Sequence, residues 1–381
     1  MVILIALNLL LLIAYGLVID FYRRSWNQIP YFHISDHEAT QLSRRVSVII
    51  PARNEEASIS NCLQSLLAQT YPTSLFEILV VNDHSEDRTE EIVRGFHQAN
   101  IKLLNLGDYI PSEPINSYKK KAIETAVLAA EGDWILCTDA DCILPPDWIR
   151  SMVLFANRNQ CVFIAAPVTM PSNRTLLSVF QSLDFSCLQG ITGAVVYKKI
   201  HCMCNGANLG YDKKIFGEIG GFGGIDEKAS GDDMLLMQKF FSKYPDRVFF
   251  IKSESVVVST ESEKTWSSFF RQRIRWASKA RGYQDRAIFW NLLFVFTLNA
   301  ALIVFFISCF WSPRFFVVLL LLIMLKTMVE FAFVRRITLF FGQSMLMKYF
   351  FFLQPIHIFY TVIAGLLGNL TVYKWKGRKV K

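Results

Sequence analysis

A chain of 381 residues has room for one large or two modest domains. Hydrophobic residues make up 52% of it and are concentrated in a few long runs, which excludes an ordinary soluble enzyme as a description of the whole chain. The formal net charge is +8, but the chain has no nucleic-acid-binding motif. We therefore expect membrane lipid headgroups or phosphates as partners and do not expect nucleic acid.

The hydrophobic runs predict membrane-spanning helices at both ends of the chain. Each run is long enough to cross about 30 Å of hydrocarbon, and together they cover residues 2–19, 291–311, 315–334 and about 350–372. Between the first two runs the composition is that of a globular domain. The predicted parts are a transmembrane helix at 1–22, a linker at 23–45, a soluble domain at 46–264, an interfacial amphipathic helix at 265–288, transmembrane or re-entrant helices at 289–373 and a basic tail at 374–381.

The first run predicts a retained anchor, because no basic region precedes it and no small-residue cleavage site follows it. Arg23 and Arg24 come directly after it, and the positive-inside rule then places the soluble domain in the cytoplasm. We therefore expect a multi-pass protein of the plasma or inner membrane. Three later crossings would leave the tail outside, whereas the basic residues of 374–381 favour the inside. One of the runs is therefore expected to be re-entrant or interfacial, and the last run, which contains Pro355, is the best candidate.

Strands and helices alternate along the soluble domain. The expected strands are Val46–Ile50, Phe76–Val81, Ile101–Leu104 and a run from Trp134 to its exit at Asp139 and Asp141, and the expected helices are Ser58–Thr70, Thr89–Gln98 and Lys119–Glu131. This alternation predicts a parallel α/β sheet, in which ligands bind beyond the carboxyl ends of the strands. No GxGxxG follows the first strand, which disfavours a dinucleotide-binding domain.

Polar clusters follow three of the predicted strands. They are Arg53-Asn54-Glu55, Asp83-x-Ser85-x-Asp87 and Asp139-x-Asp141. Because parallel strands end at the same edge of a sheet, all three clusters are expected at one binding site. Unrelated turns would not be expected to coincide in this way.

The Asp139-x-Asp141 pair by itself has two interpretations. Alternate residues of a strand point to the same side, so both carboxylates would converge on one ligand at the exit of the strand. Adjacent carboxylates repel each other unless they share a proton or a cation, and a hard divalent ion that also bridges substrate phosphates would satisfy them. The alternative is a solvated turn that happens to contain two aspartates.

The second half of the soluble domain adds Asn205-Gly206-Ala207-Asn208 and the glycine-rich stretch 220–224, which leads into a helix near Asp232 and Asp233. One of these two carboxylates could simply cap the helix. The stretch Thr265–Arg286 interleaves aromatic and basic residues, which predicts an interfacial helix or a juxtamembrane anchor.

Lys326 and Glu330 lie four residues apart in the third hydrophobic run and should share one helix face. A charge near the middle of the bilayer costs about 2.5–3.5 kcal/mol, and pairing reduces this cost. We expect a structural pair near the cytoplasmic boundary, where Glu330 can also reach Arg335 and Arg336, rather than a contact with a lipid acceptor.

Taken in order, these motifs resemble those of family 2 inverting glycosyltransferases, in particular the membrane-embedded branch of that family. The resemblance runs from about Val46 to Trp276. The motifs that carry it are P-x-R-N-E at 51–55, N-D-x-S-x-D at 82–87, D-A-D at 139–141, G-D-D at 231–233 and Q-x-x-R-W at 272–276. The resemblance implies an α/β fold of the GT-A type, a Rossmann-like nucleotide-diphospho-sugar transferase domain, with transmembrane helices at both ends.

The resemblance also implies roles for individual residues. Those expected to bind the nucleotide-sugar donor are Pro51, Glu55, Asp83, Lys119, Asp139, Gln272 and Arg275. Asp83 would contact the base and Lys119 the phosphates, although the run of lysines at 119–121 leaves the register open. Asp139 would contact the ribose or the metal.

The remaining roles concern the metal, the acceptor and the chemistry. The resemblance implies that Asp141, together with Asp139, holds Mg²⁺ or Mn²⁺. Asp233 would be the general base, with Asp232 beside it, and Gly206 and Trp276 would contact the acceptor. A packed Trp at the membrane interface is an equal interpretation of Trp276.

The chain departs from the family pattern at two positions. Asn82 stands where the family usually has the first Asp of a pair, and Asp232 stands where Glu usually precedes the base. The expected function is transfer of one sugar from a nucleotide-sugar, by resemblance a UDP-sugar, to a lipid or lipid-linked acceptor or a glycan. The alternative is a processive synthase that extends and exports a β-linked polysaccharide, which the Q-x-x-R-W motif also marks. A non-catalytic membrane scaffold is a third class, disfavoured because every chemically required position is filled.

Overall fold

The computed structural model describes residues 2–34, 43–110, 117–226, 231–278, 286–370, 373–375 and 378–380. Parts of the predicted interfacial helix (279–285) and of the predicted basic tail lie outside these residues. The chain forms two compact units, which we describe separately. Unit 1 comprises Met1–Gln28, Met170–Ala194 and Ser262–Tyr373, and unit 2 comprises Ile29–Thr169, Val195–Glu261 and Lys374–Lys381.

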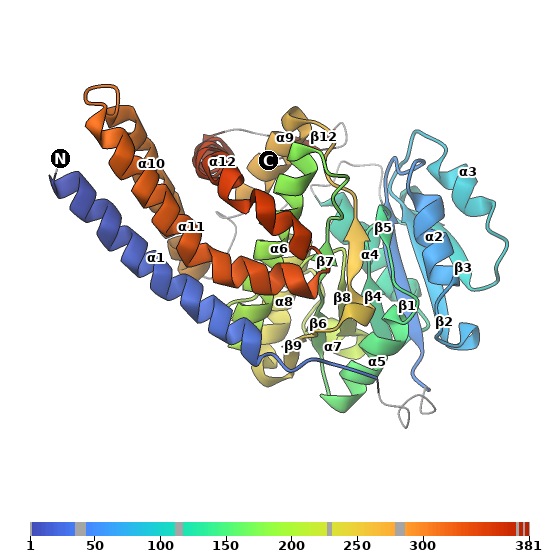
Figure 1. The fold of residues 1–381 in the computed structure, drawn as a ribbon. Coiled ribbons are helices and arrows are strands. Elements are labelled where there is room, and N and C mark those ends of the chain that lie inside the picture. The colour runs from blue at the N-terminus through green and yellow to red at the C-terminus, as the bar shows by residue number, and fades with distance from the viewer. Residues whose placement is uncertain are drawn as a thin grey trace. The chain divides into compact units, whose positions relative to one another are not determined.

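Unit 2 is built on a seven-stranded sheet with the order β3-β2-β1-β4-β8-β6-β9 (Figure 1). Its strands are β1 (Val46–Ala52), β2 (Phe76–Asn82), β3 (Ile101–Asn105), β4 (Trp134–Cys137), β6 (Phe163–Ala165), β8 (Leu209–Asp212) and β9 (Val248–Phe250). A smaller sheet has the order β5-β10-β7, with β5 at Cys142–Ile143, β10 at Val258–Thr260 and β7 at Val168–Thr169. Near the C-terminus, β11 (Tyr373–Trp375) pairs with β12 (Arg378–Val380).

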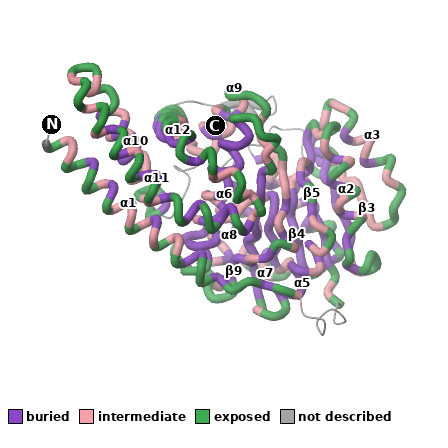
Figure 2. The backbone as a smooth tube through the Cα atoms, in the orientation of Figure 1, coloured by how far each residue is buried: buried purple, intermediate pink, exposed green. Residues whose placement is uncertain are grey.

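The continuous apolar runs of the sequence become the central strands. All residues of β2 and β4 are buried, and so are all residues of β1 except Pro51. In the parallel register, Val48 lies between Ile78 of β2 and Leu136 of β4. These apolar side chains form the core of the sheet, which is buried along its centre (Figure 2).

Helices connect the strands of unit 2. They are α2 (Ile59–Leu67), α3 (Thr89–Arg94), α4 (Tyr118–Ala129), α5 (Trp148–Arg158), α7 (Lys213–Glu218) and α8 (Asp232–Lys243). The period expected for the first helix is confirmed, because α2 buries Ile59, Cys62, Leu63 and Leu66. The second predicted helix was expected to reach Gln98 but ends at Arg94, where Gly95 follows.

The four predicted strands pair in parallel, as expected. The complete sheet is nevertheless mixed, because β8, which was not predicted, runs antiparallel between β4 and β6. The predicted extent of the fourth strand is wrong. The strand that begins at Trp134 ends at Cys137, so Asp139 and Asp141 lie in the turn between β4 and β5, where the Cys142 N–H donates to the Asp139 carbonyl (3.2 Å). Aspartate is a poor strand residue and a good turn residue, so strand alternation does not orient these two carboxylates.

Unit 1 consists mainly of long helices. They are α1 (Val2–Gln28), α6 (Leu176–Tyr197, of which 176–194 belong to this unit), α9 (Trp266–Ser278), α10 (Arg286–Ser308), α11 (Arg314–Phe340) and α12 (Phe350–Leu370). Helix α11 packs against α1 and α10, and α12 packs against α9 and α10 (Figure 1). No motif in the sequence indicated that residues 170–194 would pack with these helices.

Four helices of the described chain are long and apolar enough to cross a membrane. They are Ile3–Gln28, Arg286–Ser308, Arg314–Phe340 and Ser344–Gly368. Large apolar side chains such as Leu17 and Leu321 are more than half exposed along their outer faces, which Figure 2 shows as exposed stretches of α1 and α11. Such faces are suited to a hydrocarbon environment rather than to water.

A buried polar cluster joins three of these helices inside unit 1. The Lys326 side chain is 0% exposed, and its Nζ donates to Glu330 Oε1 (2.6 Å) and Gln354 Oε1 (2.9 Å). The Tyr15 hydroxyl of α1 donates to Glu330 Oε1 (2.6 Å), and the Gln354 amide of α12 donates to Glu330 Oε2 (2.6 Å). His357 Nδ1 lies 3.4 Å from the Lys326 ammonium.

The expected pairing of Lys326 with Glu330 is therefore confirmed, but the expected contact of Glu330 with Arg335 and Arg336 is not observed. Glu330 does not reach toward Arg335 and Arg336, because Tyr15 and Gln354 already occupy both of its carboxylate oxygens inside the helix bundle. A buried ion pair is tolerated when further hydrogen bonds satisfy the remaining polar atoms, as they do here.

We predict that Lys326→Met destabilises unit 1 by about 3–5 kcal/mol, because it leaves the Glu330 carboxylate buried without a counter-charge. The double variant Lys326→Met/Glu330→Gln should recover much of this loss, because it also removes the charge. Thermal unfolding of the full chain in detergent measures both. Lys348→Met, which changes an exposed lysine, is the control, and equal melting temperatures for the single and double variants would refute the role of the pair.

Candidate active site

The polar clusters that follow β1, β2 and β4 come together at one edge of the unit 2 sheet, as the sequence predicts. The strands are parallel, with Ala52 opposite Asn82 and Ile49 opposite Cys137. Their carboxyl ends therefore deliver the three turns to the same edge.

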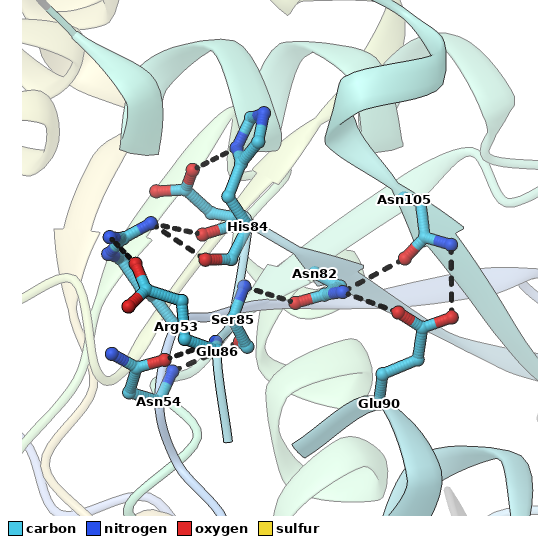
Figure 3. Close-up of polar contacts among 9 residues, drawn as sticks. Arg53, Asn54, Asn82, His84, Ser85, Glu86, Glu90 and Asn105 are labelled. Carbon is cyan, nitrogen blue, oxygen red and sulfur yellow. Dashed lines mark hydrogen bonds and ion pairs between the residues drawn. The ribbon is translucent and has the colours of Figure 1, made fainter. Parts of the chain in front are cut away.

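The first two turns are fastened to each other by Arg53. Its side chain is 8% exposed, and its Nη1 donates to the backbone carbonyls of Asp83 and His84, both at 2.9 Å (Figure 3). A buried guanidinium needs such acceptors, and here it finds them on the turn after β2. Arg53 belongs to the P-x-R-N-E motif, but the sequence does not predict a role for it.

Asn54 completes the connection between the two turns. Its backbone is left-handed (φ 51°), a conformation that Asn adopts more readily than most residues. Its N–H donates to Ser85 Oγ (3.0 Å), and the Glu86 N–H donates to Asn54 Oδ1 (2.8 Å; Figure 3). The two turns therefore form one rigid platform.

Asp83 lies on this platform with a buried carboxylate. Its side chain is 4% exposed, and its Oδ1 is 3.0 Å from His84 Nδ1. His84 is also left-handed (φ 52°) and packs edge-on against the ring of Tyr118. No pattern in the sequence singled out His84.

Asn82, the first departure from the family pattern, forms hydrogen bonds through both its amide nitrogen and its side-chain oxygen. Its amide nitrogen donates to Glu90 Oε2 (3.1 Å) and Asn105 Oδ1 (3.0 Å), and its Oδ1 accepts from the Ser85 N–H (3.1 Å; Figure 3). An aspartate at this position would place its carboxylate against that of Glu90. The neutral amide therefore fits Glu90, and Asp83 stays beside it as the carboxylate of the turn.

Lys119, at the start of α4, faces the third turn. Its Nζ donates to Asp139 Oδ1 (2.7 Å) and lies 3.8 Å from Asp232 Oδ2. Burial lowers the pKa of Lys119, but the nearby carboxylates, Asp139 first, outweigh burial and leave this pKa above the ordinary lysine value. The ammonium is therefore charged.

The next two lysines of the run have other partners. Lys120 is buried and donates to the Ile225 carbonyl (2.6 Å), whereas Lys121 pairs with Glu124 of its own helix (2.8 Å). Of the three, Lys119 is the one whose contacts to the Asp139 turn are observed. The assignment of Lys119 to the nucleotide phosphates stays a prediction.

Asp141 differs from its neighbour Asp139 in its surroundings. Its Oδ2 accepts from the Thr260 hydroxyl of β10 (3.0 Å), and among the described residues no lysine or arginine pairs with it. Burial raises the pKa of Asp141, and the negative charges of Asp139 and Glu55 raise it further. Thr260 is distant in sequence and carried no recognisable signal.

These carboxylates fit a Mg²⁺ or Mn²⁺ ion that substrate phosphates also hold. Within the described ranges no group of three or more His, Cys, Asp or Glu side chains could hold a metal ion by itself. A small divalent ion bound by one or two carboxylates plus phosphate oxygens needs no such group. Burial is the main cause of the raised pKa of Asp141, and the charges of Asp139 and Glu55 add to it; a bound cation would offset both effects.

Asp233 is oriented by two backbone amides. The Gly206 N–H donates to its Oδ2 (3.0 Å), and the Met234 N–H donates to its Oδ1 (2.8 Å). A Cβ added at Gly206 would lie 3.5 Å from Lys119 Nζ and 3.8 Å from Asp232 Oδ2. Glycine thus leaves open the space where the ammonium and the carboxylates meet.

The Q-x-x-R-W residues lie on α9 and belong to unit 1. Gln272 donates to Glu263 Oε1 (3.2 Å), and the ring of Trp276 lies 4.3 Å from the Arg273 guanidinium and against Phe185. The roles of Gln272, Arg275 and Trp276 at the donor and acceptor remain predictions.

Arg273, which the sequence did not single out, fixes α9 within unit 1. Its side chain is 3% exposed and lies 2.9 Å from Asp184 Oδ2 of α6. Asp184 Oδ1 in turn accepts from the Tyr360 hydroxyl of α12 (2.7 Å). These contacts set the rotation of α9 and hence the faces on which its motif residues lie.

Two family models match this chain. One, glycosyl transferase family 2, matches residues 47–220, and the other, glycosyl transferase family group 2, matches residues 134–334, more than half of the chain. Among curated relatives, the probable glycosyltransferase YdaM of Bacillus subtilis is 30% identical over 242 residues, which are 61% of this chain and 54% of that protein. The dolichyl-phosphate beta-glucosyltransferase ALG5A of Trichomonas vaginalis is 27% identical over 189 residues, 46% of this chain and 55% of that protein. This chain thus spans about half the length of either relative.

Among solved structures, a mannosyltransferase from Pyrobaculum calidifontis in complex with GDP-Man and Mn²⁺ has the same fold. The TM-score is 0.58 at 18% identity, and the match covers 96% of this chain and 99% of the other. The likeness in fold agrees with the α/β sheet, of the GT-A type, that the sequence predicts. On the family matches, the chain belongs to glycosyltransferase family 2.

Proposed function

We propose that this chain is a membrane-bound inverting glycosyltransferase that moves one sugar from a nucleotide-sugar, by resemblance a UDP-sugar, to a lipid or lipid-linked acceptor. The observation that carries the proposal is the meeting of Lys119, Asp139 and the Asp232-Asp233 pair around Gly206. Inverting transfer needs a cation for the departing diphosphate close to a base for the acceptor, and this group offers both.

In the proposed reaction, the acceptor hydroxyl oxygen attacks the anomeric carbon while the bond from that carbon to the diphosphate breaks. Asp233 takes the hydroxyl proton, and the nucleoside diphosphate leaves with the electrons of the broken bond. The two backbone amides on Asp233 hold the carboxylate in one orientation, as a positioned base requires. Asp232 lies nearer to Lys119 and is the less favoured base.

Donor binding is assigned to the platform after β1 and β2 and to the turn after β4. Asp83 would contact the base, Glu55 and Pro51 would border it, and Lys119 would contact the phosphates. Asp139 and Asp141 would hold Mg²⁺ or Mn²⁺, which when bound neutralises charge on the diphosphate. Arg275 and Gln272 of α9 are proposed as further donor contacts, because Arg suits the geometry of phosphate.

The four apolar helices support a membrane location. We propose a multi-pass protein of the plasma or inner membrane with a cytoplasmic catalytic unit, because Arg23 and Arg24 follow the first apolar run. An acceptor carried by a lipid would reach such an enzyme directly, and the name of the relative ALG5A includes a dolichyl-phosphate acceptor. Gly206 and Trp276 are the proposed acceptor contacts.

We predict that Asp233→Asn lowers transfer about 10²- to 10⁴-fold, because an amide cannot take the acceptor proton. Nucleotide binding should be retained. Asp232→Asn is the matched control and should lose less activity. Single-turnover transfer and nucleotide titration of the full chain measure both effects, and a normal rate for Asp233→Asn would disprove the assignment of the base.

We predict that Asp141→Ala loses nucleotide-dependent Mn²⁺ binding and lowers transfer about hundredfold or more. The reason is that the variant lacks the carboxylate of the turn that has no ion-pair partner among the described residues and is proposed to bind the metal. Electron paramagnetic resonance of Mn²⁺ with the full chain measures the binding. Asp246→Ala, which removes an exposed carboxylate of the same unit, is the control and should change neither quantity. An active, metal-independent Asp141→Ala variant would contradict the metal assignment.

The product separates single transfer from polymer synthesis. Membranes containing the protein are supplied with labelled UDP- and GDP-sugars, and the products are partitioned between organic and aqueous phases and then sized. We expect one sugar on a product that enters the organic phase. A ladder or a high polymer would instead identify a processive polysaccharide synthase.

A further inference from the structure

Lys119 is paired with carboxylates, which a residue that served only to bind phosphate would not require. Its Nζ donates to Asp139 Oδ1 at 2.7 Å, while Asp232 Oδ2 lies 3.8 Å away. The exposed fractions of the three side chains are 25% for Lys119, 33% for Asp139 and 13% for Asp232. The ammonium is therefore already engaged by carboxylates and only partly screened by water.

The two carboxylates of the D-A-D turn are consequently not equivalent. Asp139 has a counter-charge, and Asp141 has hydrogen bonds but no ion-pair partner among the described residues. The Lys119 ammonium uses one oxygen of Asp139 and repels a second cation at short range. Of these two carboxylates, Asp141 is therefore the one that a divalent ion arriving alone can reach without opposition from Lys119.

We propose that Lys119 is a resident counter-cation of Asp139 that opposes metal binding until a nucleoside diphosphate draws its ammonium away, and that it thereby couples metal binding to nucleotide binding. This inference rests on the proposed function, because it takes the D-A-D turn as the metal site. It adds a role for Lys119 that is exerted before any transfer takes place.

The exchange follows from the donors and acceptors involved. An ammonium has three N–H donors and no preferred plane, so it can move from a carboxylate to a diphosphate oxygen without a large rearrangement. Asp232 Oδ2, 3.8 Å from the ammonium, is a second acceptor beside Gly206. Once Lys119 leaves Asp139, both carboxylates of the turn can act as ligands.

A tether is the competing explanation. In that case the Lys119–Asp139 pair would only fasten α4 to the turn after β4, and removing it would lower stability without changing the affinity for metal. Replacement of Lys119 distinguishes the two, because loss of a tether leaves the enhancement of Mn²⁺ binding by nucleotide unchanged, whereas loss of a counter-cation reduces it. The coupling can be measured in either direction. Nucleotide must tighten Mn²⁺ binding by the same factor by which Mn²⁺ tightens nucleotide binding.

The test measures Mn²⁺ binding to the full chain in detergent by electron paramagnetic resonance, alone and with UDP or GDP. For Lys119→Met we expect affinity for Mn²⁺ alone to rise about tenfold, because an opposing charge is gone. The enhancement by nucleotide should shrink by about the same factor. Lys119→Arg, which keeps the charge, should behave more like the wild type.

Lys121→Met is the matched control, because Lys121 lies on the same helix but pairs with Glu124. It should leave both affinities unchanged. If the nucleotide enhances Mn²⁺ binding equally in the wild type and in Lys119→Met, the counter-cation role is overturned while the proposed metal site stands. If the wild type binds no Mn²⁺ even with nucleotide, the metal assignment fails and this inference fails with it. Should Lys119→Met not fold, Lys119→Gln takes its place with the same expectations.

Discussion

The parallel pairing of β1 with β2 and β4 determines where the donor-site candidates of unit 2 lie. Because Ala52 is opposite Asn82, the turns that carry Arg53 and Asp83 emerge side by side. Arg53 then donates hydrogen bonds to two backbone carbonyls of the neighbouring turn, and these bonds hold the two turns together. A slip of one residue in this register would turn the buried side chains of β1 to the opposite face and separate the two turns.

Charge then organises the rest of this edge. Carboxylates from two separate stretches of the chain, Asp139 and Asp232, lie near the ammonium of Lys119. Gly206 adds no side chain to this space, and its N–H orients Asp233. The arrangement places opposite charges within reach of one another, where a diphosphate and a hydroxyl could both be handled.

The sequence predicted much of the fold, because buried strands and amphipathic helices leave strong periodic patterns. It predicted the central strands, α2 and the apolar helices. It failed at the Asp139 turn, because an apolar run does not show where its strand ends once polar residues follow. It also could not predict β8 between β4 and β6, since strand direction depends on long-range pairing. Thr260 and His84 escaped notice because their roles come from contacts that no spacing in the chain encodes.

The order in which unit 1 is synthesised gives the Lys326–Glu330 pair a second significance. Glu330 lies one helical turn after Lys326 on α11, so the two charges can neutralise each other as soon as that helix forms. Tyr15 is made long before them, and Gln354 is made after them. A helix with this pair would enter a bilayer as a nearly neutral segment, before all its hydrogen-bonding partners are present. For the membrane protein proposed above, the pair would offset an insertion cost of about 2.5–3.5 kcal/mol for a single charge.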